Sequence, residues 1–305
     1  MSVSRRTDVP AFHSEWFMNR VRAGSALVRN PVCRDLLHRV ELSTESVDCF
    51  VFFTKDPRPM MRHLDELDGM GHEYVFQITV NPYGADIEPG VPRKAEVAES
   101  FRELGDRIGR GRLVWRYDPV ILGGRMTVEY HRRKFETLCN ELGDRTDRCT
   151  VGFLRRYGKL EDRLAAAGLR TPDARERGEL AGWMAESAGS RGIELTRCCP
   201  GEGPPTPGLE SRACVDGATM RALGIPHDPE VRPLRDGCEC IRNVDIGAYD
   251  TCGHGCIYCY ANSHRPGARA GNVYDPGSEL LFGGVGPGDT VTELPSRRNR
   301  RIDGF

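Results

Sequence analysis

Short apolar stretches alternate with longer amphipathic ones along most of this chain, and this alternation limits the possible folds more than any other feature. Apolar stretches typical of buried strands occur at residues 2–5, 49–54, 74–80, 113–117, 150–154, 193–197 and 243–249. Helical spacing occurs between them, at residues 14–23, 92–108, 128–142 and 172–188. The alternation predicts an α/β fold with a parallel sheet, either doubly wound or closed into a barrel, and about seven such units favour a complete or partial TIM-type (β/α) barrel.

The cysteines are distributed very unevenly. Of the 12 in the 305 residues, four lie before residue 198 and eight lie between residues 198 and 259. The first residues do not resemble a secretion signal, so we expect a cytoplasmic protein in which clustered cysteines bind metal rather than form disulfides. The formal net charge of -1 gives no general argument for nucleic acid, and no apolar run is long enough to predict membrane insertion.

The sharpest motif is Cys252-Gly-His-Gly-Cys256-Ile-Tyr-Cys259, directly after the last expected strand. Three thiolates with this Cx3Cx2C spacing can bind three irons of a [4Fe–4S] cluster and leave the fourth iron open to another ligand. The glycines between them allow the backbone to approach a cluster closely. Zinc is the alternative, with the three cysteines and His254 or His264 as ligands.

The motif resembles the signature of the radical S-adenosylmethionine (SAM) superfamily, in which an aromatic residue, here Tyr258, precedes the last cysteine. The resemblance implies that Cys252, Cys256, Cys259 and Tyr258 form the cofactor site and that SAM binds the open iron. It also implies an electron donor such as flavodoxin or ferredoxin. One electron then cleaves SAM to methionine and a 5′-deoxyadenosyl radical, which abstracts a hydrogen atom from the substrate.

A second cysteine group precedes the motif. Cys198, Cys214, Cys238 and Cys240 could form a closed four-thiolate site, and Cys199 could replace its neighbour. Such a site suits an auxiliary [4Fe–4S] cluster or a structural zinc ion, and the Cys-Glu-Cys spacing, unusual for zinc, favours the cluster. The four cysteines farther upstream are expected to be small buried hydrophobic residues: Cys33, Cys49, Cys139 and Cys149.

Several stretches resemble a bacterial family that carries the domain-of-unknown-function label DUF1848: residues 2–12, 52–57, 114–119, 245–262 and 279–283. The resemblance spans nearly the whole chain but implies no reaction. In the wider superfamily the cysteine motif follows the first barrel strand, whereas here it follows residues 243–249. We therefore expect a circularly permuted barrel: residues 1–197 form its βα units, residues 198–242 the auxiliary metal segment, and residues 243–305 the cluster-bearing strand, loop and tail.

Polar residues at the carboxyl ends of barrel strands face the active site. The catalytic candidates chosen on this basis are Arg5, Arg6, Asp8, Lys55, Arg116 and Asp118, with Thr54, Asn81 and Arg155 as further strand-end residues. Their many cations suit an anionic substrate. The alternative is that they form buried ion pairs or, for the two aspartates, cap helices.

Two other functions remain open. The chain could be a non-catalytic Fe–S or zinc protein with an electron-transfer or structural role. It could also be a radical SAM lyase-like enzyme that acts on nucleic acid, an analogy that depends on the fold and on the basic run at residues 297–301.

Overall fold

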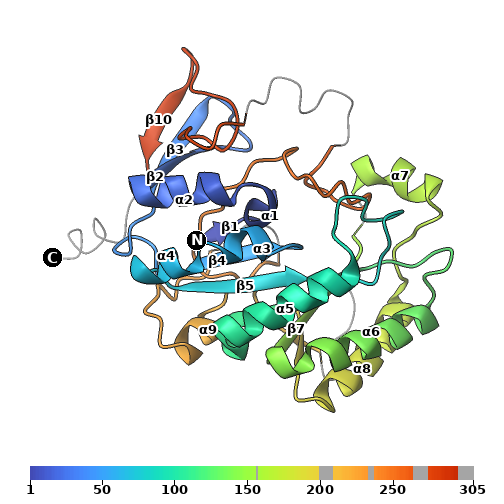
Figure 1. The fold of residues 1–305 in the computed structure, drawn as a ribbon. Coiled ribbons are helices and arrows are strands. Elements are labelled where there is room, and N and C mark those ends of the chain that lie inside the picture. Colours follow the sequence, from blue (N-terminus) through green and yellow to red (C-terminus); the bar gives the residue numbers. More distant parts are fainter. Residues whose placement is uncertain (156, 199–208, 233–236, 264–273, 295–305) are drawn as a thin grey trace.

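A parallel sheet with helices packed against it forms the body of the molecule (Figure 1). The computed structural model describes residues 1–155, 157–198, 209–232, 237–263 and 274–294. Seven parallel strands lie in the order β1-β4-β5-β6-β7-β8-β9. Apart from two strands that belong to a smaller sheet, this spatial order is the chain order, so each connection leads to the neighbouring strand. The α/β class predicted from the sequence is confirmed.

The strands of the large sheet are β1 (Ser2–Val3), β4 (Phe50–Thr54), β5 (Tyr74–Thr79), β6 (Leu113–Val120), β7 (Arg148–Phe153), β8 (Glu194–Arg197) and β9 (Glu210–Ser211). The helices are α1 (Val9–Phe12), α2 (Ser14–Ala23), α3 (Arg58–Met61), α4 (Leu64–Gly69), α5 (Lys94–Ile108), α6 (Val128–Leu142), α7 (Glu161–Ala166), α8 (Ala174–Gly189) and α9 (Gly217–Ala222). Short 3-10 helices occupy Arg110–Arg112, Gly143–Arg145 and Gly158–Leu160. The four predicted helices correspond to α2, α5, α6 and α8.

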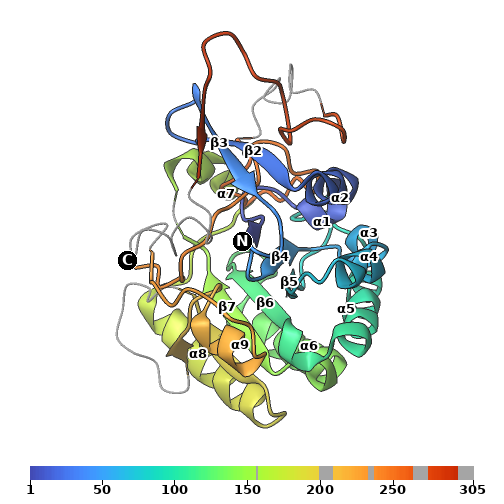
Figure 2. The same ribbon diagram turned by 90° about the vertical axis from the view of Figure 1, so that its left-hand side faces the viewer.

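Alternate residues of the strands belong to two different cores. Phe52 and Phe76 pack in the main core with apolar residues of α2, α4, α5, α6 and α8. Val51 and Val75, their neighbours in sequence, belong to a separate buried cluster that contains Cys214 and the residues around it. Because side chains alternate along a strand, one face of the sheet is covered by helices and the other faces cysteines. Figure 2 shows β4 to β7 side by side, with α3, α4 and α5 to one side of them.

A second, three-stranded sheet was not predicted. It consists of β2 (Ser25–Arg29), β3 (Leu36–Glu41) and β10 (Thr290–Glu293), in the order β10-β3-β2. β2 and β3 form an antiparallel hairpin, and β10, from the far end of the chain, adds in parallel to β3. Charged residues within these stretches obscured the strand pattern.

The predicted strand at residues 243–249 is wrong as a regular strand. Asp245 makes a single parallel bridge with Ser2, supported by hydrogen bonds from Ser2 N to Val244 O (2.8 Å) and from Ile246 N to Ser2 O (3.2 Å). β1 has only two residues, so there is little strand for this segment to pair with. The segment still lies beside β1.

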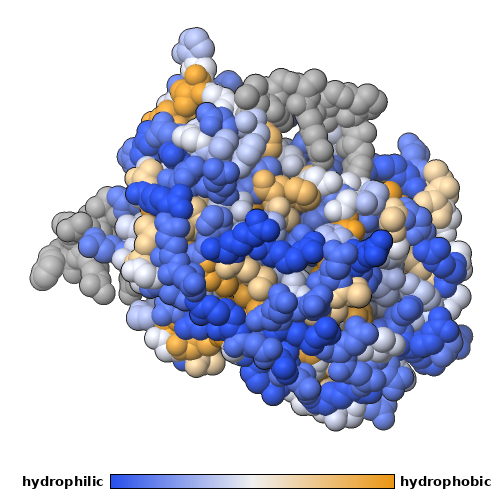
Figure 3. All heavy atoms as spheres, viewed as in Figure 1, coloured by the Kyte–Doolittle hydropathy of each residue, from blue (hydrophilic) through white to orange (hydrophobic). Residues whose placement is uncertain are grey.

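No helix among the described residues is long and apolar enough to cross a membrane. The face viewed in Figure 3, which includes α5 and α6, is mostly hydrophilic with small scattered hydrophobic areas. This pattern agrees with helices whose apolar sides pack on the sheet.

Candidate functional site

The cysteine loop, residues 252–259, begins shortly after the segment that bridges to β1. It therefore lies at the carboxyl-terminal ends of the parallel strands. Side chains that follow two strands reach it there. Asp8, after β1, accepts a hydrogen bond from His254 Nε2 at 2.8 Å. Lys55, after β4, places its Nζ 5.6 Å from the centre of the Tyr258 ring. Two of the strand-end residues predicted from the sequence, Asp8 and Lys55, therefore lie at the cysteine loop.

The three thiols of the loop lie close enough to influence one another electrostatically. Cys256 is buried, and Cys252 and Cys259 are partly buried. Burial raises the pKa of the Cys252 and Cys256 thiols to about 12, and Lys55 opposes this rise at Cys256. Three converging thiols of this kind are a donor set for a soft metal or a metal–sulfur cluster.

Residues 87–90 pack directly against the cysteine loop. Gly90 N donates to His254 O at 2.8 Å, and Ile257 N donates to Ile87 O at 3.0 Å. A Cβ at Gly90 would lie 2.6 Å from Gly253 O, which is too close for any side chain. Glycine at position 90 is therefore what allows the two backbone segments to meet.

His254 is engaged at both ring nitrogens. Nε2 contacts Asp8 at 2.8 Å and Nδ1 contacts Gly90 O at 3.0 Å, and the ring is 2% exposed. Because neither nitrogen faces the thiols, His254 is poorly placed to be a zinc ligand and instead fastens the loop to α1 and to residues 87–90. His264, the other histidine considered for zinc, lies outside the described residues.

Glu88 is the functional candidate that sequence reasoning missed. Its fully buried carboxylate accepts from Lys55 Nζ at 2.8 Å, from Asn81 Nδ2 at 3.3 Å, and from Lys94 Nζ and the Tyr258 hydroxyl. Burial alone would raise the pKa of Glu88, but Lys55 and Lys94 outweigh it and lower this pKa to about 2. Glu88 is therefore a carboxylate held between two cations beside the cysteine loop.

No periodic pattern marks Glu88, because it lies in the irregular connection between β5 and α5. Only the Pro89–Gly90 pair that follows it indicates a turn. A local signal of that kind cannot reveal that the turn docks on a loop more than 160 residues farther along the chain.

Asp245 pairs with Arg5 and Arg6, two of the predicted catalytic residues. Its carboxylate accepts from Ser4 Oγ at 2.5 Å and from the Arg5 backbone N at 2.8 Å. The Nε atoms of Arg5 and Arg6 lie 3.5 Å and 3.9 Å from it. The ion-pair alternative thus describes both arginines, and Asp245 is a partner that the sequence did not single out.

Arg116 lies on the sheet face that carries the second cysteine group. It donates to Gln77 Oε1 at 2.8 Å and forms an ion pair with Asp118. Its guanidinium carbon lies 5.8 Å from the centre of the Phe53 ring, and that of Arg5 lies 5.6 Å from the same ring. The two arginines therefore converge on Phe53, although they are 111 positions apart in the printed sequence.

Asp8 has the capping role considered as its alternative. As the N-cap of α1 it accepts from Ala11 N at 2.9 Å, and its other oxygen accepts from Lys55 N at 2.7 Å and contacts His254. One carboxylate thereby joins the ends of β1 and β4 to the cysteine loop.

The remaining strand-end residues divide between the site and its periphery. Asn81 is buried and exchanges two hydrogen bonds with the backbone of Asp118, at 3.0 Å and 2.9 Å, beside Glu88. Thr54 accepts from Asp56 N at 2.9 Å and so stabilises a turn. Arg155 is exposed.

The family model for a domain of unknown function, DUF1848, matches residues 1–261. The chain belongs to the DUF1848 family. The match includes every residue of the cysteine loop and of the Glu88 network. A comparison with curated proteins found no match.

In this DUF1848 protein the second cysteine group is brought together by three separate segments. Cys198 Sγ lies 3.3 Å from Cys214 Sγ, which lies 3.6 Å from Cys240 Sγ. Hydrogen bonds with Cys198 and Cys214, together with burial, raise the pKa of Cys240. Cys238 is 5% exposed in the same cluster. Cys199, the possible substitute, lies outside the described residues.

Three of the four upstream cysteines of this DUF1848 chain are buried as expected: Cys49, Cys139 and Cys149. Cys33 is exposed, because it lies in the turn between β2 and β3, in a hairpin that the sequence did not reveal. Within the part of the chain that the structure describes, no three or more His, Cys, Asp or Glu side chains already stand in the arrangement of a metal site, so either cysteine group would have to adjust when a metal binds.

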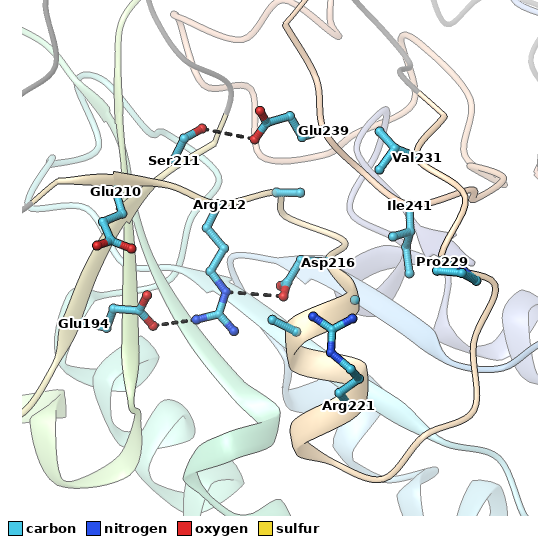
Figure 4. A pocket seen from close by; sticks show the side chains of 13 residues that line it. Glu194, Glu210, Ser211, Arg212, Asp216, Arg221, Pro229, Val231, Glu239 and Ile241 are labelled. Atoms are coloured by element: carbon cyan, nitrogen blue, oxygen red, sulfur yellow. Dashed lines mark hydrogen bonds and ion pairs between the residues drawn. The ribbon is translucent and has the colours of Figure 1, made fainter.

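A pocket of about 450 Å³ beside α9 is lined by none of the predicted site residues (Figure 4). On its wall, Arg212 contacts Glu194 at 2.5 Å and Asp216 at 3.3 Å. The basic run at residues 297–301 lies outside the described residues.

Proposed function

We propose that this DUF1848 chain is a radical SAM enzyme, in which the cysteine loop binds a [4Fe–4S] cluster with one open iron. One observation supports this proposal above all. Three thiols lie beside buried charged side chains at the carboxyl-terminal ends of parallel strands. Strand ends of parallel sheets are where active sites of α/β proteins form.

The residues present fit such a cluster. Cys252, Cys256 and Cys259 supply the three thiolates, and His254 has its nitrogens turned to other partners. The close backbone approach at Gly90 forms one wall of the site. When bound, the cluster and SAM would supply a 5′-deoxyadenosyl radical for hydrogen-atom abstraction.

Lys55, Glu88 and Tyr258 would bind and shield the cofactor. Their network is almost wholly removed from water and lies beside Cys256. A lysine and a glutamate near Cys256 would offer complementary charges to the carboxylate and ammonium groups of SAM. We expect the same burial to exclude water from the reacting groups.

Arg5 and Arg116 would face the substrate, with Phe53 between them. Two guanidinium groups on an aromatic ring suit an anionic substrate. A ferredoxin or flavodoxin would supply the electron, and we place the protein in the cytoplasm.

The proposed architecture is a circularly permuted, partial TIM-type barrel. The strand order does not reverse along the sheet. Because the connections are right-handed, all crossover helices then lie on one face. In a doubly wound sheet the order reverses and helices cover both faces. Ile241 N donates to Val215 O at 3.0 Å, near β9, and Asp245 bridges to Ser2 of β1. These two contacts support a chain segment that bridges the two edges of the sheet.

Cys256→Ala tests the proposal. After anaerobic reconstitution, we expect the unmodified protein to bind about four irons at the loop and, with SAM and reductant, to release 5′-deoxyadenosine. Cys256→Ala should lose both, whereas Cys49→Ala should keep them. Cys49 is the matched control because burial also raises its pKa to about 12, and it belongs to a different buried cluster from Cys256.

Reconstituted protein that binds iron but never cleaves SAM would support the non-catalytic Fe–S alternative, and zinc in the loop would support the zinc alternative. The nucleic-acid alternative predicts binding to DNA or RNA that weakens steeply as salt increases.

A further inference from the structure

The second cysteine group has the form of a closed site. Cys198 follows β8, Cys214 lies between β9 and α9, and Cys238 and Cys240 belong to a later irregular segment. Cys214, Cys238 and Cys240 are each less than 9% exposed, and Cys198 is partly buried against the same cluster. Four thiols from three segments rarely converge in a core without a role for their sulfur atoms.

The distances between the sulfur atoms discriminate between the two kinds of metal group. Zinc–sulfur bonds of about 2.3 Å in a tetrahedron place the sulfurs roughly 3.8 Å apart. The sulfur of Cys214 lies 3.3 Å from that of Cys198 and 3.6 Å from that of Cys240. In a cubic cluster each thiolate binds a different iron, so its sulfurs must stand much farther apart than around one shared ion.

We propose that Cys198, Cys214, Cys238 and Cys240 bind one tetrahedral zinc ion. The four thiols lose four protons when Zn²⁺ binds, which leaves a site of net charge -2. The hydrogen bonds between the thiols of Cys198, Cys214 and Cys240 are replaced by bonds from each sulfur to the metal. The sulfur atoms then move apart by a few tenths of an ångström.

The surroundings favour an anionic centre. Arg5 interacts electrostatically with Cys214 and Cys240, and Arg116 does so with Cys198 and Cys214. Both arginine side chains are partly buried on the same side of the sheet, where their charge attracts thiolates even though each also pairs with an aspartate.

The zinc ion would stabilise a part of the chain that has little regular structure. In the described residues between 209 and 242, only β9 and α9 are regular elements, and each is short. A metal that joins the end of β8 to residues 214, 238 and 240 supplies the cohesion that a small apolar cluster cannot.

The test is metal analysis of the full-length protein, unmodified and with Cys252, Cys256 and Cys259 all replaced by alanine. We expect about one zinc per chain in both, and loss of iron only in the triple variant. Iron and sulfide retained by the triple variant, or protein without zinc, would overturn the proposal. Cys214→Ser should reduce zinc at least tenfold, whereas Cys49→Ser, within the same buried cluster, should not.

Cobalt keeps the test decisive if Cys214→Ser does not fold. Unmodified protein loaded with Co²⁺ should show the strong visible absorption of a tetrahedral tetrathiolate site, and the weak spectrum of six-coordinate Co²⁺ would contradict it. The result is independent of the proposed function: zinc can be present without SAM cleavage, and SAM cleavage can occur with no zinc.

Discussion

At the scale of single residues, the candidate site depends most on Glu88. Its side chain is 0% exposed, and two lysines and a tyrosine donate to it. A buried carboxylate is stable only when such partners surround it. Glu88 therefore holds Lys55, Lys94 and Tyr258 in one arrangement next to Cys256.

Glu88→Gln should destabilise the protein strongly. The substitution removes the negative charge and leaves Lys55, 13% exposed, buried without its carboxylate partner. Loss of one partner of a buried pair costs about 3–5 kcal/mol, and we expect a decrease toward that range in the free energy of unfolding measured with urea.

Glu66→Gln is the matched control. Its partner Arg22 and Glu66 itself are 44% and 39% exposed, so this ion pair contributes only about 0–1 kcal/mol. Equal effects of the two substitutions would contradict the role assigned to Glu88.

At the scale of elements, the helices pack on the sheet mainly through apolar residues, but α6 also does so through a histidine. His131 contacts the Tyr117 hydroxyl at 2.7 Å and Ile121 O at 2.8 Å, and its side chain is fully buried. Since Ile121 O can only accept, Nε2 carries the proton and Nδ1 accepts from Tyr117. Burial lowers the pKa of His131 to about 4, so the ring is neutral in the folded protein.

This histidine predicts a pH-dependent stability. In the unfolded chain the ring titrates near its ordinary pKa of about 6.5, so the unfolded state binds the proton more readily. Stability should therefore fall as the pH decreases from about 6.5 to about 4, by up to roughly 3 kcal/mol from this group.

His131→Gln removes this titration. Urea unfolding at several pH values should show the unmodified protein losing its advantage over the variant as the pH falls. Parallel losses in the two proteins would refute the assignment.

At the scale of the whole molecule, distant parts of the chain meet at β1. Residues 2–6 contact residues 243–247 through backbone hydrogen bonds and through the Asp245 carboxylate. Gly247 allows this contact, because a Cβ there would lie 1.9 Å from Ser4 Oγ. The position of the cysteine loop therefore depends on a junction between segments about 240 positions apart.

Asp245→Ala should loosen this junction. It removes the acceptor for Ser4 and for the Arg5 backbone and leaves two arginines without their partner. We expect the free energy of unfolding to fall by about 3–5 kcal/mol and reconstituted iron to decrease with it. Asp65→Ala, at a 93% exposed carboxylate, should change stability by no more than about 0.5 kcal/mol. A stable Asp245→Ala protein with full iron content would show that the junction is unnecessary.

Local patterns were sufficient for much of this protein. Helical spacing predicted α5 and α6 within two residues, because an amphipathic helix that packs on a sheet repeats its apolar residues locally. The family resemblance is confirmed by the family model over residues 1–261. The Cx3Cx2C spacing identified the loop that lies at the carboxyl-terminal ends of the strands. The [4Fe–4S] cluster in that loop stays a prediction.

The tertiary structure decided the partners of these residues. Each contact joins residues that are distant in the sequence. Glu88 and Lys55 are 33 positions apart, and Cys198 and Cys214 are 16 apart. The junction at Asp245 joins segments about 240 positions apart. Periodicity reports which side of an element is buried, but not which distant group meets it. Buried charges and thiols acquire their roles from such neighbours, because only the folded chain removes them from water and brings their partners within reach.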